Sequence, residues 1–469
     1  MSYRVKTATV YLLGFFLDLI NLFVANVAYP VIGKDLGADV NELAWVGTGY
    51  ILGLTLIIPL SSWLSKRLGA KTILILSLSL FTVATAGAGT AGSVYVLIAW
   101  RVLQGLGGGL LIPVGQTLTY QQYRPDERAG LTSLILLVAL LAPALSPAVG
   151  GIIVDYLGWR WIFFINLPLA LLTLVFALCW LKADEKPAAP SAPFDLYGFI
   201  TGSAGLILLL LGLGRLGSST TLSSGALFTI AGLAALIIFT RLSLKNAQPV
   251  LNLKLIRDPL MRISMLVYLL IPGVFIGVSM ITMLYLQSVL GMRASDTGFL
   301  MLPWSLASFL AITLTGKLYN RCGPRPLFII GCIMQGTGIA LLTQADATTY
   351  PLLLAAFAFM GMGGSLCSST AQSTAFIQTP HDHLADASAI WNINRQLAFG
   401  FGVAFLSLFL NMILSWQGVD NVNNSAQHSA IIHAFRLCFM FVAVSALIPL
   451  ILCLRLPNKQ ILQTLKNRT

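Results

Sequence analysis

Uninterrupted apolar runs of about twenty residues recur along this chain, and they limit what it can fold into. A run of that length crosses the hydrocarbon core of a bilayer as a helix, and in lipid only helices and closed barrels satisfy their own backbone. The runs are continuous rather than alternating, which favours helices. Of the 469 residues only 9% are charged, whereas a water-soluble domain carries about 25%. The sequence therefore predicts an all-α polytopic membrane protein.

The runs predict fourteen membrane-spanning helices in an order of six, two and six. The spans lie near 8–33, 43–63, 72–90, 94–119, 131–154 and 159–181, then 196–214 and 225–243, then 259–290, 296–319, 327–344, 350–376, 387–414 and 431–455. Polar stretches at 182–195 and 245–258 separate the three groups. We therefore expect an N-terminal six-helix bundle in 1–182, a linker with two extra spans in 183–258, and a C-terminal six-helix bundle with a cytoplasmic tail in 259–469.

The distribution of Lys and Arg predicts the orientation, because basic residues are enriched in cytoplasmic loops. With a cytoplasmic N-terminus, Lys34, Arg160, Arg215 and Arg293 fall on the opposite side, and most of the other basic residues face the cytoplasm. We expect a multi-pass protein of the bacterial inner membrane with both termini in the cytoplasm. This distribution also explains the net charge of +12 without a nucleic-acid partner.

Several functional classes lack their signatures in this sequence. It has no Gly-x-Ser-x-Gly, no His-Glu-x-x-His and no phosphate-binding Gly-x-x-x-x-Gly-Lys-Ser/Thr, and no histidine lies deep in a predicted span. We therefore expect neither an enzyme nor an ATP-driven pump, and no cofactor or metal. The six cysteines are scattered through apolar runs without paired spacing, as small core residues are.

An internal repeat relates the two sets of six spans. The second span ends at 62–71 with SWLSKRLGAK, and the second span of the last six ends at 316–325 with GKLYNRCGPR. An Arg, a Gly and a final basic residue coincide at the same spacing. Two related halves with a basic loop at equivalent places are typical of transporters that rock two bundles about a central site.

Several further motifs follow one another in order along the chain. They are NVAYP at 26–30, RVLQGLGG at 101–108, SPAVGG at 146–151, WRWIF at 159–163 with Asn166 and Pro168, YLQ at 285–287 with Pro303, and RQL at 395–397. With the repeated basic loop they make nearly the whole chain resemble the major facilitator superfamily, and more narrowly its fourteen-helix drug:proton antiporter branch. The resemblance implies the major facilitator fold, two six-helix bundles plus two inserted helices.

In the family, an Asp in the repeated loop pairs with cationic side chains and a helix terminus, which locks the halves in the outward-facing state. Here that position is Lys66, and in the second copy it is Asn320. The resemblance assigns conformational gating to Arg67 and Gly69 and to their counterparts Arg321 and Gly323. The alternative is that these residues only set the topology.

The fifth span contains helix-kinking and small residues. Pro143 and Pro147 each remove a helix hydrogen bond, and Gly150 and Gly151 allow a neighbouring helix to approach closely. The resemblance implies a flexible interface between the halves, with Pro147, Gly150 and Gly151 in gating. Ordinary packing of small residues explains the same pattern.

Asp18 is the acid that lies deep in a predicted span. The family usually has an Asp at the position of Asn21, and Asp18 lies on nearly the same helix face, one turn away. We expect Asp18 to bind a proton or cation, and the alternative is a structural partner for a buried Arg. The resemblance assigns Arg101 to proton coupling, while a hydrogen-bonding role at the interface stays open.

Polar and aromatic side chains at midplane positions are candidates for the substrate site, because they suit an amphipathic ligand. They are Asn21, Asn26, Gln116, Tyr285, Gln287, Trp304, Gln372, Trp391 and Arg395. For Arg395 the alternative is bridging between helices.

The leading hypothesis is a secondary active transporter that exports small amphipathic compounds or drugs in exchange for protons, by alternating access. Its partners would be the substrate, protons and the lipid bilayer, and we expect it to function as a monomer. The alternative is uptake or export of a specific metabolite such as a siderophore or an organic anion.

Overall fold

A computed structural model of the chain describes residues 1–38, 40–124, 126–182, 194–216, 221–292, 299–346, 349–419 and 427–466. Within the helices, the side chains of 22–23, 25–27, 29–30, 40–41, 44, 142–148, 151, 155, 287–288, 301 and 464–466 lie outside this description. Every regular element of the described ranges is helical, as the continuous apolar runs predict.

The N-terminal helix group contains the helices between residues 3 and 180. Its members are α1 (Tyr3–Leu36), α2 (Val40–Ile57), η1 (Ile58–Leu60), α3 (Ser61–Leu68), α4 (Ala70–Gly89), α5 (Val94–Tyr120), α6 (Arg128–Leu157), α7 (Trp161–Phe164) and α8 (Leu167–Trp180). The second predicted span is divided into α2, η1 and α3 because Pro59 cannot donate a helix hydrogen bond.

A helical hairpin and a short linker follow. They are α9 (Leu196–Leu216), α10 (Leu222–Lys245) and η3 (Leu253–Arg257). Glycines let the two hairpin helices approach closely, since a Cβ at Gly212 or Gly232 would meet the backbone of the other helix. The hydroxyl of Ser203 in α9 donates to the Leu56 carbonyl of α2 at 3.0 Å. The hairpin thus lies against the N-terminal group, and α9 also packs against α17.

The C-terminal helix group contains the helices between residues 259 and 454. Its members are α11 (Pro259–Tyr268), η4 (Leu269–Gly273), α12 (Val274–Leu284), η5 (Tyr285–Val289), α14 (Met301–Cys322), α15 (Pro324–Leu341), η6 (Leu342–Gln344), α16 (Tyr350–Ala375), η7 (His381–His383), α17 (Leu384–Trp416), α18 (His428–Ser445) and α19 (Leu447–Leu454). A last helix, α20 (Asn458–Lys466), follows this group.

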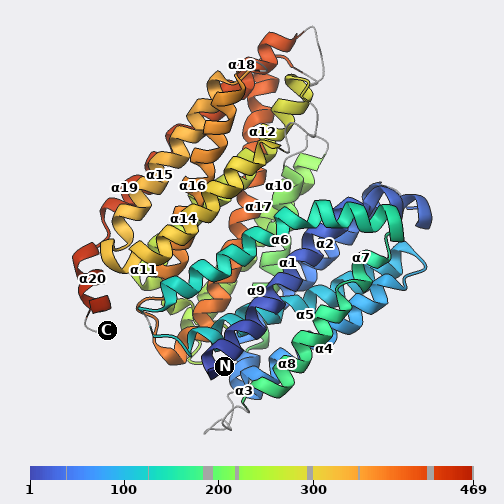
Figure 1. The fold of residues 1–469 in the computed structure, drawn as a ribbon, viewed down its shortest axis with the longest axis vertical. Helices are drawn as coiled ribbons and strands as arrows, with labels where there is room; N and C mark the ends of the chain where they lie inside the picture. Colours follow the sequence, from blue (N-terminus) through green and yellow to red (C-terminus); the bar gives the residue numbers. More distant parts are fainter. Residues whose placement is uncertain are drawn as a thin grey trace.

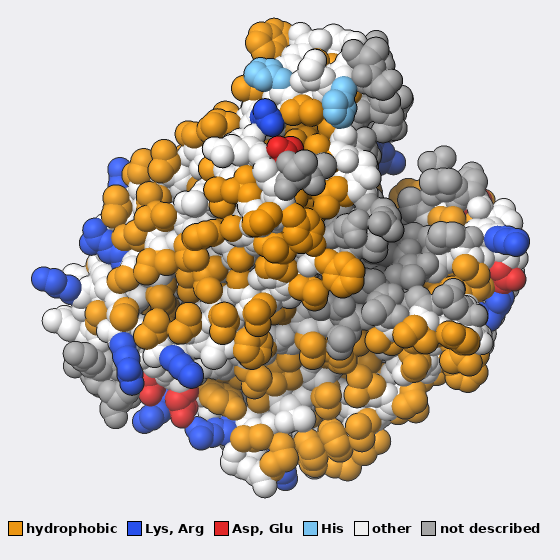
Figure 2. Space-filling model, turned by 45° about the horizontal axis from the view of Figure 1, so that its top comes forward, with side chains coloured by type: hydrophobic (Ala, Val, Ile, Leu, Met, Phe, Trp, Pro, Cys, Tyr) orange, Lys and Arg blue, Asp and Glu red, His pale blue; other side chains and the backbone are white. Residues whose placement is uncertain are grey.

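Eleven helical segments of the described chain are long and apolar enough to cross a membrane. Helices α1, α6 and α14 are not among the eleven, although each coincides with a predicted span. The total of fourteen spans and the division into two six-helix bundles therefore remain predictions. Figure 2 shows hydrophobic side chains over broad areas of the surface in view, with most Lys and Arg side chains near its outline. A lipid-facing surface has this distribution.

The two helix groups lie together at one end of the molecule and splay apart toward the other (Figure 1). We name the first end the basic end, because it holds both termini and the connections from α3 to α4 and from α14 to α15. Lys66, Arg67 and Arg321 lie in the last helical turns before these connections. Helix α6 of the N-terminal group packs along α14 of the C-terminal group, and α5 packs against α17. These pairs place side chains of both groups in one interface.

The internal repeat has a structural counterpart in two glycine turns at the basic end. Gly69 joins α3 to α4 with φ 86° and ψ 148°, and Gly323 joins α14 to α15 with φ 76° and ψ 177°. These dihedral angles lie in a region that is essentially restricted to glycine. The coincidence of the two glycines in the sequence therefore reflects one backbone turn used twice.

Candidate functional site

A chain of buried polar side chains links four helices of the N-terminal group, α1, α2, α4 and α5. The Arg101 guanidinium of α5 donates to the Val46 carbonyl at 3.2 Å and to Gln104 Oε1 at 2.7 Å. Gln104 Nε2 donates to Asn21 Oδ1 of α1 at 2.9 Å and to Thr85 Oγ1 of α4 at 2.7 Å. Arg101, Gln104 and Asn21 are fully buried. The predicted residues Arg101 and Asn21 thus belong to one network, with Gln104 between them.

Asp18 lies one turn before Asn21 in α1, with 2% of its surface exposed. The hydroxyl of Tyr50 in α2 donates to the Asp18 carboxylate, and the Arg101 guanidinium lies 4.4 Å from the centre of the Tyr50 ring. Tyr50 therefore stands between the buried acid and the buried base. The hydrogen bond and the nearby cation both stabilise the ionised carboxylate, whereas burial disfavours it.

The glycines of the motif at 101–108 make room for this arrangement. A Cβ at Gly105 would meet the Tyr50 backbone, and one at Gly108 would meet the Asp18 carboxylate and the Tyr50 hydroxyl. The motif therefore supplies the Arg101 guanidinium and the Gln104 amide that joins it to Asn21. Its glycines leave the space in which Asp18 and Tyr50 meet.

Two hydrogen bonds between side chains join the helix groups in the interior. Asn392 Nδ2 of α17 donates to Gln116 Oε1 of α5 at 3.0 Å, and Gln372 Nε2 of α16 lies 3.2 Å from the Tyr120 hydroxyl of α5. Gln116 is 1% exposed and Gln372 is 3% exposed. Both predicted substrate residues thus lie in the interface between the groups, and each contacts the opposite group.

Trp391 and Arg395 lie one helical turn apart on α17, close to Asn392. The Trp391 ring packs edge-on against Tyr268 with 5.1 Å between ring centres. The Arg395 guanidinium lies 5.4 Å from the centre of the Phe15 ring of α1, so it reaches across to the N-terminal group. Both predicted residues therefore lie where α1, α11 and α17 meet.

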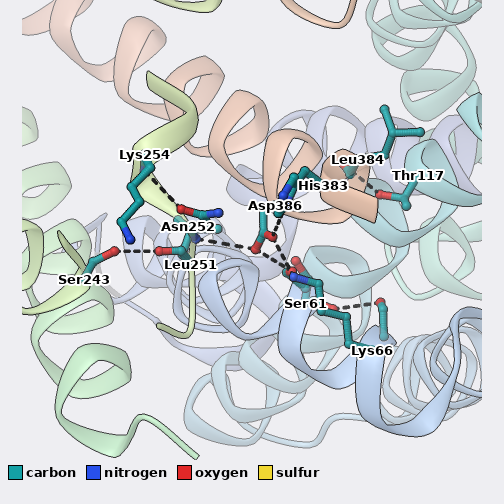
Figure 3. A network of polar contacts seen from close by, with 12 residues as sticks. Ser61, Lys66, Thr117, Ser243, Leu251, Asn252, Lys254, His383, Leu384 and Asp386 are labelled. Atoms are coloured by element: carbon teal, nitrogen blue, oxygen red, sulfur yellow. Dashed lines mark hydrogen bonds and ion pairs between the residues drawn. The ribbon is translucent and has the colours of Figure 1, made fainter. Parts of the chain in front are cut away.

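A carboxylate joins the two groups at the basic end (Figure 3). Asp386, in the first turn of α17, accepts from Lys66 Nζ of α3 at 2.6 Å and from the Ser62 hydroxyl at 2.7 Å. Its side chain is 2% exposed, whereas that of Lys66 is 52% exposed. The backbone N–H of Asn252, in the linker, lies 3.5 Å from the same carboxylate. Asp386 thus ties the N-terminal group, the linker and the C-terminal group together.

Three side-chain-to-carbonyl bonds accompany this ion pair. Arg128 donates to the Phe376 carbonyl at 2.9 Å, Asn320 to the Asp126 carbonyl at 2.5 Å, and Thr117 to the Leu384 carbonyl at 3.4 Å. In the described part of the chain, the hydrogen bonds that join the groups lie in the interior or at the basic end. This distribution agrees with the splayed opposite end in Figure 1. The molecule is therefore closed at the basic end.

The repeated basic loop differs from the family pattern in a way that the structure clarifies. The loop position that is Asp in the family is Lys66 here, and its partner is the acid Asp386. An ion pair is thus present with its charges exchanged. In the second copy, Asn320 crosses to the N-terminal group by a hydrogen bond to a backbone carbonyl.

The other predicted gating residues have local contacts. The Arg67 guanidinium lies 5.0 Å from the centre of the Trp63 ring. Gly69 and Gly323 form the two turns described above, and Asn458 of α20 packs against Gly323. Arg321 is exposed in the last turn of α14, and Gly150 is buried in α6. The side chains of Pro147 and Gly151 lie outside the described residues.

The remaining predicted substrate residues are not part of the α1–α11–α17 junction. The Tyr285 hydroxyl donates to the Ala345 carbonyl at 2.8 Å, and its ring packs among Phe435 and Phe439 in the C-terminal core. Trp304 of α14 stacks on Phe275 with 5.5 Å between ring centres. The side chains of Asn26 and Gln287 lie outside the described residues.

Two residues of the site were missed by the sequence analysis. In the sequence, Tyr50 looks like any aromatic residue inside a predicted span. Only the fold brings its hydroxyl to Asp18. Asp386 precedes the predicted span at 387–414, so it reads as a loop acid. One signal was available, because Lys66 at an acidic position of the family calls for an acid elsewhere.

Comparison with known proteins identifies the family of this chain. The family model of the Major Facilitator Superfamily matches residues 11–403 and 273–467. The chain belongs to the major facilitator superfamily. Because that family consists of transporters, the chain is a multi-pass membrane transport protein, and the resemblance inferred from the motifs is confirmed.

Relatives in this superfamily match the chain over most of its length. The "Multidrug resistance protein B homolog" of Mycobacterium tuberculosis (strain CDC 1551 / Oshkosh) is 30% identical over 86% of this chain and 76% of its own. The "Putative multidrug resistance protein MdtD" of Enterobacter sp. (strain 638) is 28% identical over 95% of this chain and 93% of its own.

A solved structure shows the same major facilitator fold. The human organic anion transporter MFSD10 (TETRAN) superposes with a TM-score of 0.67, covering 97% of this chain and 100% of that one, at 15% sequence identity. At this identity the likeness concerns the fold alone. It supports the arrangement of the two helix groups about a shared interface.

Proposed function

We propose that this major facilitator transporter exports small amphipathic compounds in exchange for protons. The observation that carries the proposal is the Asp18 carboxylate, which is buried in α1, accepts a hydrogen bond from Tyr50 of α2 and lies near Arg101 of α5. An acid inside the bilayer costs at least ~2.5–3.5 kcal/mol on insertion scales, and such acids mark proton pathways. The relatives named as multidrug resistance proteins support export of drug-like compounds.

Alternating access requires that the two helix groups separate at one end when they close at the other. The closed basic end, joined by Lys66, Asp386, Ser62 and Asn320, is one of these two states. Opening it breaks the Lys66–Asp386 ion pair and frees the path from the basic end to the interface. Arg67, Gly69, Arg321 and Gly323 gate this step by holding the two basic turns.

We place the basic end in the cytoplasm of a bacterial inner membrane, following the excess of Lys and Arg. The structure then has the outward-facing form, in which Asp18 receives a proton from outside. We also propose that the chain divides into bundles at 1–182 and 259–469 with a linker at 183–258, and that it works as a monomer.

A test uses inside-out membrane vesicles that contain the wild type or Asp18→Asn. An imposed pH gradient, acid inside, is followed with a fluorescent amine while candidate compounds are added. Proton exchange predicts that a transported compound partly dissipates the gradient with the wild type and not with the variant. Equal dissipation with both proteins would refute the role of Asp18.

A further inference from the structure

Two hydrogen-bond donors lie without acceptors at the junction of α1, α11 and α17. The Trp391 indole N–H is buried, with 1% of the residue exposed, and has no hydrogen-bond partner among the described residues. One turn later, Arg395 makes no ion pair or hydrogen bond within that part of the chain, although it is half-buried. An intramembrane ionisable residue is a functional-site hypothesis by default, and the opposite charge that acts on Arg395 is the Asp18 carboxylate of the N-terminal group.

Each of the nearest side-chain acceptors already accepts a hydrogen bond from the protein. Gln116 Oε1 accepts from Asn392, the Asp18 carboxylate accepts from Tyr50, and Gln104 Oε1 accepts from Arg101. Even so, the buried Trp391 indole N–H has no acceptor among the described residues. A fully buried indole N–H is expected to be paired, and the half-buried Arg395 makes no ion pair in the described part of the chain, so an acceptor group that enters the site would satisfy both donors.

The surroundings of these donors are aromatic. The Arg395 guanidinium lies over Phe15, and Tyr268 packs against both Trp391 and Phe399, with ring centres 5.1 Å and 6.3 Å apart. Such walls accommodate a flat apolar group, whereas the donors require an acceptor at its end. The combination fits an aromatic or otherwise apolar compound that carries one carboxylate or sulfonate.

We propose that Arg395 and Trp391 form an anion-binding subsite, and that the transported compounds are small amphipathic anions. The planar guanidinium would bind two oxygens of a carboxylate, and the indole N–H would donate a third hydrogen bond. The proposal rests on the proposed transport function for its biological role. It narrows the substrate class, because an amphipathic cation would be repelled by Arg395.

The test compares binding of three compounds that share one ring system: 2-naphthoate, 2-naphthylmethanol and 2-naphthylmethylammonium. Full-length protein in lipid nanodiscs is titrated with each compound by isothermal calorimetry. We expect 2-naphthoate to bind at least about tenfold more tightly than the other two, since charge-assisted bidentate bonds are the strong ones. Arg395→Gln should remove this preference, and Arg395→Lys should retain part of it.

Trp391→Phe keeps an aromatic ring and removes only the N–H donor. It should weaken 2-naphthoate binding roughly two- to tenfold and leave the alcohol unchanged. Arg160→Gln and Trp180→Phe are matched controls, because Arg160 pairs with Asp35 outside the junction and Trp180 stacks on Phe176 in α8. Both controls should bind 2-naphthoate as the wild type does.

Two results would overturn the subsite. One is wild-type binding that does not depend on the charge of the probe, including no measurable binding of 2-naphthoate at millimolar concentrations. The other is an unchanged preference of Arg395→Gln for 2-naphthoate over the alcohol and the amine. If that variant does not fold, the subsite is refuted when Trp391→Phe and Arg395→Lys both bind 2-naphthoate as the wild type does. Charge-selective binding without proton exchange would instead keep the subsite and refute proton-coupled export.

Discussion

Replacing Lys66 should shift the protein toward the state that is open at the basic end. The Lys66–Asp386 pair joins the two helix groups at 2.6 Å, and it breaks when they separate. Exposed pairs contribute about 0.2–1 kcal/mol, and loss of one partner of a buried pair costs about 3–5 kcal/mol. With one side chain 52% exposed and the other 2% exposed, we expect a coupling of about 1–2 kcal/mol, or about 5- to 30-fold in the ratio of the two states.

The coupling is measured with Lys66→Gln, Asp386→Asn and the double variant. Spin labels at Thr72 in α4 and Lys317 in α14, both exposed at the basic end, report the separation of the groups by electron–electron double resonance. Cys179 and Cys322 are first replaced by Ser, because both are exposed and would also be labelled.

We expect Lys66→Gln to increase the long-distance population about 5- to 30-fold in the native background and less than about twofold beside Asp386→Asn. The control is Arg4→Gln, which removes the 2.8 Å Arg4–Glu127 pair inside the N-terminal group and should not change the distances. An equal shift by Lys66→Gln in both backgrounds would refute the ion pair as the contact that holds this end closed.

Three further predictions follow from individual contacts. Gly108→Ala should cost about 1–3 kcal/mol of stability and reduce transport, because its methyl group would meet Asp18 and Tyr50; thermal unfolding and flux assays check this, and unchanged flux would contradict it. Gly69→Ala and Gly323→Ala should each cost about 1–3 kcal/mol of folding stability, because their backbone φ angles of 86° and 76° are strained for alanine. Thermal unfolding measures this, with Gly37→Ala as the control. Gly37 has φ 64° and ψ 30°, which are less strained for alanine, and an added methyl group would meet no neighbouring atom there. Asp35, beyond the predicted first span, accepts hydrogen bonds from Trp159 and Arg160, and these bonds lower the pKa of its carboxyl group. The stabilisation of the fold is therefore present above the usual carboxyl pKa and is lost as the pH falls through the lowered pKa. Asp35→Asn should lower the unfolding temperature at neutral pH and have no effect on it in strong acid.

The sequence was sufficient for the features that depend on local pattern and on the cost of burial. The helix positions follow from the apolar runs, Asp18 from its isolation among apolar residues, and the turns at Gly69 and Gly323 from the repeat. These signals are local, since each is contained in one segment of the chain.

Features that depend on contact between distant segments were not predictable in the same way. Tyr50 acts through a hydrogen bond to another helix, and Asp386 through a residue 320 positions away. An acid in the first turn of a helix is also favoured by the helix dipole alone, so Asp386 gave no distinct signal. Tyr285 was predicted to face the substrate because it is a polar aromatic residue near the middle of a predicted span. The structure instead places its ring within the core of the C-terminal helix group.

The most direct test of proton-coupled transport uses purified protein in liposomes that contain a pH-sensitive dye. An outward gradient of a transported compound is imposed without a pH gradient, and the internal pH is followed for the wild type, Asp18→Asn and Tyr50→Phe. Exchange through Asp18 predicts internal acidification with the wild type, none with Asp18→Asn, and slower acidification with Tyr50→Phe, which loses the hydrogen bond to the carboxylate. Compound efflux through the wild type without a change in internal pH would contradict proton exchange.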